Sequence, residues 1–141
     1  MKLRIIIDKE REEEILIYAH ERTDLIKSIE RLLAPSDGLT AYSETDAVKL
    51  TDDEIFCFIS ENGNTYAITE AEKLKVRLRL YQLEERLGNN FIRLNQSCIG
   101  NVSKMKRFES GFSGSLTVVF KNGYKDYVSR RQLKAVKERL G

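Results

Sequence analysis

The strongest constraint on the fold of this chain is a hairpin signal near its C-terminus. Two runs with strand-forming residues, LTVVF at 116–120 and YKDYV at 124–128, are separated by a turn that contains Asn122-Gly123. This dipeptide is the strongest short-range signal for a turn between antiparallel strands. Similar short runs precede it, and two short segments have helical spacing. The C-terminal two thirds of the chain are therefore predicted to be mainly β with short helices.

A short basic helix is predicted directly after this hairpin. Ser129 and Gln132 have the spacing of a capping box, and the apolar residues that follow keep helical spacing: Leu133, Val136 and Leu140. Arg130 and Arg131 then lie in the first turn, where the helix dipole disfavours cations unless a phosphate is bound. An arginine can also bind O6 and N7 of guanine. The alternative is two solvated arginines on a surface helix.

A polar segment upstream offers further groups that could contact nucleic acid. Four amide or hydroxyl side chains fall within seven positions: Asn95, Gln96, Ser97 and Asn101. Amides can bind adenine edges, and hydroxyls can bind phosphates. The alternative is a polar turn next to a buried strand, in which Asn101 caps the turn that follows. A basic run, Lys104, Lys106 and Arg107, comes next.

The charge of the chain is distributed unevenly along the sequence. Residues 1–54 hold 8 basic and 14 acidic side chains, whereas residues 55–141 hold 16 basic and 8 acidic ones. From Phe91 onward, 11 basic residues face 3 acidic ones. A basic C-terminal part is expected of a surface that contacts phosphate. The acidic front part is expected to face away from DNA or to contact another protein.

Other classes of protein find little support in the sequence. No apolar run reaches the roughly 20 residues that cross a bilayer, and the first residues lack a signal-peptide pattern, so a cytoplasmic protein is expected. Cys57 and Cys98 are too few and too far apart for a metal motif and are expected to be buried, reduced thiols. His20 is the only histidine. We therefore predict no enzyme activity, no cofactor and no metal site.

The first 43 residues are predicted to form a separate extension. Two apolar runs, Leu3 to Ile7 and Ile15 to Tyr18, flank a charged stretch and predict two strands joined by an exposed turn. A helix is expected to begin after Thr23, its N-cap, and to stop before Pro35, in the boundary sequence PSDG. The sequence of residues 1–43 thus predicts a strand-strand-helix unit, which is too short to be a phosphoacceptor receiver domain.

The middle of the chain predicts further strands. These are a strand at 55–60, a hairpin tip in the sequence ENGN, strands at 65–69 and 74–78, a helix that ends at Gly88, and strands at 91–94 and 105–108.

Residues 44–141 resemble the LytTR class of bacterial DNA-binding domains. The most specific part is FIRLNQSCIGN at 91–101, followed about thirty residues later by VSRR at 128–131. Two departures from the family pattern are Cys98, where an aromatic residue is usual, and Gln96, where a basic one is frequent. The resemblance implies a fold of antiparallel β-sheets with short helices, which places loops rather than a recognition helix in successive major grooves.

The resemblance also implies contact residues. Base contacts are expected from Thr65, Asn101 and Arg131, one in each of three loops. Contacts with the DNA backbone are expected from Arg93, Asn95, Gln96, Ser97, Lys104 and Arg130. Arg93 could instead form an ion pair with Glu109 or another acid inside the fold.

The function implied is that of a transcriptional regulator that binds specific double-stranded DNA sequences as a homodimer. Small regulators of this kind are often accompanied by a membrane protein that holds them inactive. Residues 1–43 are expected to mediate dimerisation or this regulatory contact. Two alternatives remain: a protein-binding module that no longer contacts DNA, and a single-strand or RNA binder that stacks bases on Tyr124 or Tyr127.

Overall fold

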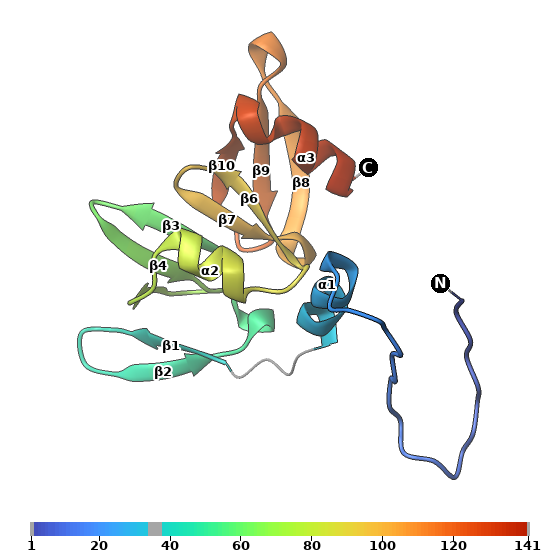
Figure 1. Ribbon diagram of the computed structural model, residues 1–141. Helices are drawn as coiled ribbons and strands as arrows, with labels where there is room; N and C mark the ends of the chain where they lie inside the picture. The colour runs from blue at the N-terminus through green and yellow to red at the C-terminus, as the bar shows by residue number, and fades with distance from the viewer. Residues whose placement is uncertain (1, 34–37, 141) are drawn as a thin grey trace.

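A large antiparallel sheet forms most of the protein. The computed structural model describes residues 2–33 and 38–140 (Figure 1). The sheet has seven strands in the order β2-β1-β5-β4-β3-β7-β6, and every neighbouring pair is antiparallel. The strands are β1 (Leu39–Tyr42), β2 (Ala47–Leu50), β3 (Cys57–Glu61), β4 (Asn64–Ile68), β5 (Lys73–Val76), β6 (Phe91–Asn95) and β7 (Cys98–Asn101).

A second, three-stranded sheet contains the predicted C-terminal hairpin. Its order is β10-β9-β8, with β8 (Met105–Ser110), β9 (Leu116–Phe120) and β10 (Lys125–Val128). Val119 pairs with Lys125, and Gly123 in the turn has a φ of 89°, so the hairpin prediction is confirmed. Helix α3 (Arg130–Leu140) follows directly and packs beside β6 (Figure 1).

Two apolar cores lie on opposite faces of the large sheet. Phe58 points into one core, and its strand neighbours Cys57 and Ile59 point into the other, as the two-residue period of a strand requires. Helix α2 (Leu80–Arg86) covers the first core with Leu80 and Leu83. The second core is closed by residues of β9, β10 and α3: Val118, Phe120, Val128 and Val136. The second sheet and α3 are thus fixed to the large sheet by burial of apolar side chains.

Most elements from residue 55 onward are close to the predictions. The hairpin at 55–69, the change from strand to helix near Leu78 and the strands that begin at Phe91 and Met105 are confirmed. Three short 3-10 helices were not predicted: η1 (Asp52–Glu54), η2 (Val102–Lys104) and η3 (Phe112–Gly114). Strand β1 was also missed. It pairs with β2 and β5, so the large sheet begins before residue 44.

The N-terminal extension differs from its prediction. The strands expected at Leu3 to Ile7 and Ile15 to Tyr18 are not formed, and that prediction is wrong. Two strands without a third strand or a core are only marginally stable in water, and neither is available here. We call residues 2–22 the N-terminal arm; it runs away from the two sheets, turns and comes back (Figure 1).

Helix α1 (Asp24–Leu33) follows the arm. Its predicted N-cap is confirmed, since the amide of Ile26 donates to Oγ1 of Thr23 at 3.3 Å. The predicted PSDG boundary falls mainly on residues 35–37, which lie outside the described residues. Within residues 2–33 and 38–140, every helix is too short or too polar to cross a bilayer.

Candidate nucleic-acid interface

The turn between β6 and β7 and the start of α3 meet at one surface. The amide of Ser129 donates to the carbonyl of Leu94 at 2.9 Å, which fixes the start of α3 against β6. Gln96 in the turn and Arg131 in the helix line the same open hollow of about 500 Å³. The fold therefore brings together the two most specific parts of the family pattern, residues 91–101 and 128–131, which lie about thirty positions apart in the sequence.

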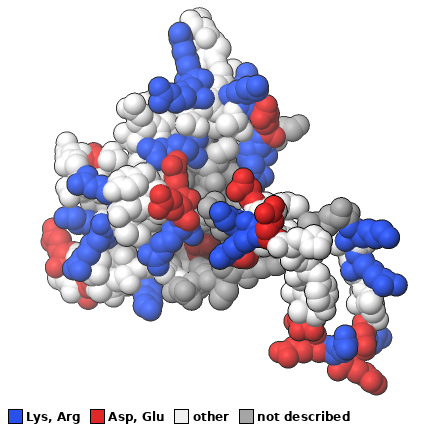
Figure 2. All heavy atoms as spheres, in the orientation of Figure 1, with Lys and Arg blue, Asp and Glu red and all other residues white. Residues whose placement is uncertain are grey.

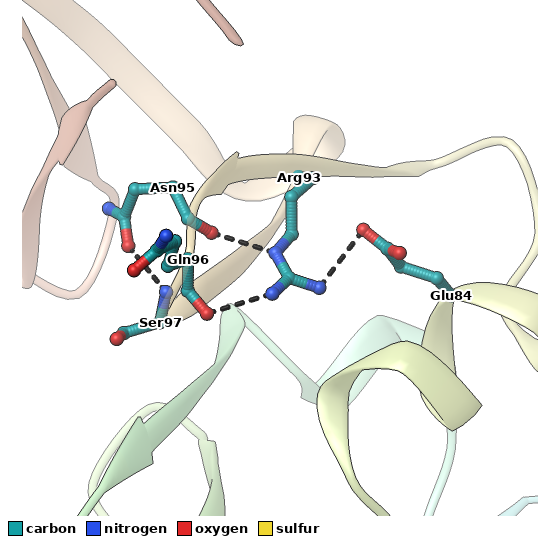
Figure 3. Close-up of polar contacts among 5 residues, drawn as sticks. All are labelled: Glu84, Arg93, Asn95, Gln96 and Ser97. Carbon is teal, nitrogen blue, oxygen red and sulfur yellow. Dashed lines mark hydrogen bonds and ion pairs between the residues drawn. The ribbon is translucent and has the colours of Figure 1, made fainter. Parts of the chain in front are cut away.

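Arg93 holds the β6–β7 turn in place from within the fold (Figure 3). Its guanidinium donates to the carbonyls of Asn95 and Gln96 at 2.7 and 2.8 Å and forms an ion pair with Glu84 of α2 at 3.1 Å. The alternative that Arg93 pairs with an acid of the fold is thus confirmed, with Glu84 as the acid; Glu109 pairs with Arg107 and Lys125. With its charge paired and each of its three guanidinium nitrogens in a polar contact, Arg93 positions the turn.

Asn95 anchors the same turn to the second sheet. Its side chain is 2 % exposed, and its amide nitrogen donates to Asp126 at 2.9 Å and to the carbonyl of Tyr127 at 2.7 Å. Its Oδ1 accepts a hydrogen bond from the amide of Ser97 at 2.8 Å (Figure 3). The side chains of Gln96 and Ser97 are left exposed at the tip, on a backbone that is tied down on both sides.

Asn101 lies inside the protein. Its side chain is 1 % exposed, and its amide nitrogen donates to the carbonyls of Asp52 and Ile55 at 3.1 and 2.8 Å. Its Oδ1 accepts from the amide and the hydroxyl of Ser103, which makes Asn101 the N-cap of η2. A side chain that is buried and fully hydrogen bonded has no free group for a base edge in this conformation.

Thr65 is also buried, at 5 % exposure, in strand β4. It pairs with Ser60 and Val76 on its two sides and does not lie in a loop. The exposed tip of this hairpin is Asn62-Gly63, where both residues have positive φ, at 52° and 80°. The structure thus brings neither Thr65 nor Asn101 to the surface that carries Gln96 and Arg131.

The remaining predicted contact residues are basic side chains near this surface. Arg130 and Arg131 are exposed in the first turn of α3, and neither forms a hydrogen bond or ion pair with the part of the chain that the structure describes. Half of the predicted capping box is present, because the amide of Gln132 lies 3.4 Å from Oγ of Ser129. Lys104 is half-buried, with Nζ 5.4 Å from the centre of the Phe56 ring.

Lys and Arg dominate the upper part of the face drawn in Figure 2, over the second sheet and α3. We use the term basic surface for the exposed basic residues from Phe91 onward: Lys106, Arg107, Lys121, Lys125, Arg130, Arg131, Lys134, Lys137 and Arg139. Two acids lie close to the turn: Glu84, which lines the hollow, is paired with Arg93, and Asp126 is half-buried and accepts hydrogen bonds from Asn95 and from the hydroxyl of Tyr124. The surface therefore presents mainly positive charge, which suits a polyanion.

Tyr124 is held in place by the same aspartate. Burial, followed by the charge of Asp126, raises the pKa of the Tyr124 hydroxyl, which therefore stays protonated. Tyr127 is 58 % exposed. Of the two tyrosines considered for base stacking, only Tyr127 presents much of its ring to solvent. Among the described residues, no group of three or more His, Cys, Asp or Glu side chains is arranged to hold a metal ion.

Comparisons with known proteins agree with this geometry. Residues 46–141 match the family model of the LytTr DNA-binding domain. The structure resembles the LytTr DNA-binding domain of a putative methyl-accepting/DNA response regulator from Bacillus cereus, with a TM-score of 0.72 and 20 % identity, over 77 % of this chain and 99 % of that one. That likeness confirms the predicted class of fold.

Relatives of known sequence match the whole length of the chain. An uncharacterised HTH-type transcriptional regulator of Staphylococcus aureus strain MSSA476 is 35 % identical over 99 % of this chain and 98 % of its own length. A protein of the same description from strain NCTC 8325 is 34 % identical over the same shares. From the family match and these relatives, the chain belongs to the LytTR family of DNA-binding domains.

Proposed function

We propose that this protein regulates transcription by binding a specific double-stranded DNA sequence, with Gln96 and Arg131 as base-reading residues. One observation carries this proposal: both side chains are exposed and line the same hollow within the basic surface. The chain's LytTR domain and its regulator relatives support DNA as the ligand.

The two side chains have the chemistry that reading of the major groove requires. A glutamine can form a bidentate contact with N6 and N7 of adenine, and an arginine with O6 and N7 of guanine. Each such pair contributes about 1–3 kcal/mol of discrimination against a wrong base. The backbone of the β6–β7 turn is already fixed by Arg93 and Asn95, so little backbone conformational entropy is lost when Gln96 binds.

Two of the three residues expected to contact bases are buried, which changes their proposed roles, and Gln96, expected to contact the DNA backbone, is proposed as a base reader instead. We assign Asn101 and Thr65 to positioning the loops and strands, in place of the direct base contacts implied by the family resemblance. Arg93 and Asn95 position the turn in the same way. Phosphate contacts are assigned to Ser97 and Arg130, which are exposed beside the two readers in sequence, and to Lys104, which is half-exposed at the other end of β7.

The regulator is proposed to bind paired sites as a homodimer. A single turn and one helix end can read only a few base pairs, and a second copy doubles the length of sequence read. Residues 1–43 lie outside the matched family region and remain the proposed site of dimerisation or of contact with a membrane protein that inhibits the regulator.

The test is selection of bound duplexes from a random DNA pool, followed by titration of the selected and a scrambled duplex. Gln96→Ala and Arg131→Ala are each expected to lower the ratio of specific to non-specific affinity by about 5- to 150-fold, the equivalent of one lost bidentate contact. Arg77→Ala is the control. Arg77 is an exposed arginine directly after β5, and β5 is separated from β7 and β6 by two other strands of the large sheet. The control substitution should leave the ratio unchanged.

A pool that yields no motif, or a ratio that survives both substitutions, would show that this surface does not read sequence. In that case the basic surface would have to serve another acidic partner.

A further inference from the structure

The N-terminal arm, residues 2–22, holds most of the large apolar side chains that the described residues expose. Eight of them lie in its two limbs and are between 42 % and 94 % exposed: Leu3, Ile5, Ile6, Ile7, Ile15, Leu16, Ile17 and Tyr18. Single exposed apolar residues are common on proteins, but a contiguous group of this size marks an interaction surface. The arm therefore needs a partner to cover it.

The backbone amide and carbonyl groups of the two limbs are also not paired with each other. No backbone hydrogen bond joins the first limb, 3–7, to the second limb, 15–18, among the described residues. The two limbs flank an open hollow of about 830 Å³. Unpaired amide and carbonyl groups on an extended, β-branched segment form a template for another strand. The partner that fits such a segment supplies a strand of its own.

The charges of the arm are arranged so that one arm can complement a second, antiparallel arm. Lys2 and Arg4 lie at its free end, whereas Asp8, Glu10 and three consecutive glutamates, 12–14, gather around its tip with two basic residues. Figure 2 shows basic groups toward the free end and acidic groups at the tip. Two arms that run antiparallel bring the basic end of each beside the acidic tip of the other. A parallel arrangement would place like charges together.

From these observations we propose that the arm pairs with the arm of a second copy of this chain, first limb against first limb, around a two-fold axis at Ile5. This proposal rests on the homodimer proposed above and specifies how the two copies meet. It does not depend on the DNA contacts of Gln96 and Arg131.

The sequence of the first limb fits this register. With Ile5 opposite Ile5 of the second copy, Leu3 faces Ile7 and Lys2 faces Asp8. A two-fold interface makes each of these contacts twice. Leu3, Ile5 and Ile7 share one face of the strand and form a continuous apolar row across the pair. Each second limb can then add at an outer edge, so that two copies together supply the strands that one copy lacks.

The apolar area is sufficient for a specific interface. A Leu or Ile side chain contributes roughly 60–120 Å² of apolar surface, so the eight side chains expose on the order of 500 Å² per copy. Two copies reach the value of about 1,000 Å² that a specific interface needs. Helix α1 can add to it, since Leu25 and Leu32 are 53 % and 60 % exposed.

The first test is the mass of the full chain in solution without DNA, by sedimentation over a range of protein concentrations. The wild type is expected to be dimeric. Ile5→Asp places two carboxylates opposite each other at the two-fold axis and should weaken the dimer at least tenfold. Phe112→Asp is the matched control, because Phe112 is 98 % exposed in η3, outside the arm, and its substitution should leave the dimer intact.

A charge exchange tests the register. Lys2→Glu alone and Asp8→Lys alone should each weaken the dimer, and the two changes together should restore it, because the pair is re-formed with its signs reversed. Ile5→Cys gives an independent measurement. Facing Cα atoms in an antiparallel pair are about 4.5–5.5 Å apart, which is within disulfide range. The native thiols Cys57 and Cys98 are buried. Mild oxidation should therefore cross-link Ile5→Cys and not Phe112→Cys.

A wild type that stays monomeric, a dimer that survives Ile5→Asp, or an absence of the Ile5→Cys cross-link would each overturn the pairing. These outcomes are distinct from a failure of the DNA proposal. Binding of the variants to a single half-site still measures the reading by Gln96 and Arg131, and Ile5→Asp should leave that half-site affinity unchanged.

Discussion

The replacement of Asn101 by alanine separates a positioning role from a base contact. In the structure its amide nitrogen donates to the carbonyls of Asp52 and Ile55, and its Oδ1 accepts from Ser103. Alanine removes these hydrogen bonds without adding bulk. The side-chain link between the segment before β3 and the end of β7 is then lost, while the backbone hydrogen bond from Asn101 to Phe56 remains, and η2 loses its N-cap.

The expected cost follows from what is left unpaired. A buried carbonyl without a partner costs about 1–3 kcal/mol, and loss of an N-cap costs about 0.5–2 kcal/mol. The two effects share one side chain and are not fully additive, so we expect the free energy of unfolding to fall by roughly 2–4 kcal/mol. For a domain of this size, the melting temperature should fall by roughly 10 °C.

The assay combines urea unfolding with DNA titration. Unfolding of wild type and Asn101→Ala gives the change in stability, and titration of selected and scrambled duplexes is done well below the melting temperature of the variant. If Asn101 positions the loop, the variant is less stable but its ratio of specific to non-specific affinity stays within a few-fold of the wild-type value. Gln96→Ala is the opposite control: its stability should change by less than about 0.5 kcal/mol, and its ratio should fall.

The reasoning would be refuted by the reverse pattern. A variant Asn101→Ala of unchanged stability that no longer distinguishes the selected duplex would mean that the side chain leaves its buried position to contact a base. The original expectation of a direct contact would then be restored.

Three further predictions concern the surroundings of the turn. Arg93→Met should lower sequence preference without changing the dependence of affinity on salt, because the charge of Arg93 is already paired with Glu84. Arg130→Ala should instead weaken binding to all duplexes and reduce the slope of log affinity against log salt by about 1. The hydrogen bond with Cys57, and then burial, raise the pKa of the Cys98 thiol, so both thiols should resist alkylation near pH 8 in the native protein and react after unfolding in urea.

The sequence predicted the strands whose partners are close along the chain. The Asn122-Gly123 hairpin and the ENGN hairpin are each defined by a turn of strong conformational preference between apolar runs. Strand β1 has no such signal. It pairs with β2 across residues 43–46, whose sequence SETD lacks a strong turn dipeptide, and with β5 across more than thirty residues, so neither pairing leaves a clear local signal. In the two N-terminal runs, by contrast, the residue types favour strands, but a single copy of the chain provides no partner strand for them.

The candidate site was predicted in its composition but not in its geometry. Arg130 and Arg131 were located correctly, because a capping box fixes where a helix begins. For Asn101 the position in the family pattern suggested a base contact, while the apolar run Cys98 to Gly100 before it indicated a buried strand. The structure favours the second reading of these residues. Strand β7 passes between β3 and β6, in the interior of the sheet, and Asn101 at its end stays inside.

The exposure of Gln96 depends on an irregularity in β6 that a pattern of alternating residues does not predict. Leu94 and Asn95 are consecutive, and both are buried, although an asparagine is usually placed at an exposed position. The pairing with β7 shifts between Arg93 and Asn95, as in a β-bulge, so that one extra residue fits into β6. The bulge turns Asn95 toward β10, where Asp126 and the carbonyl of Tyr127 bind its amide. With Asn95 turned inward, the tip of the hairpin consists of Gln96 and Ser97, which point to solvent beside Arg131. Which side chain of this segment is exposed for the proposed contact with DNA is therefore decided by a shift of one position within the strand.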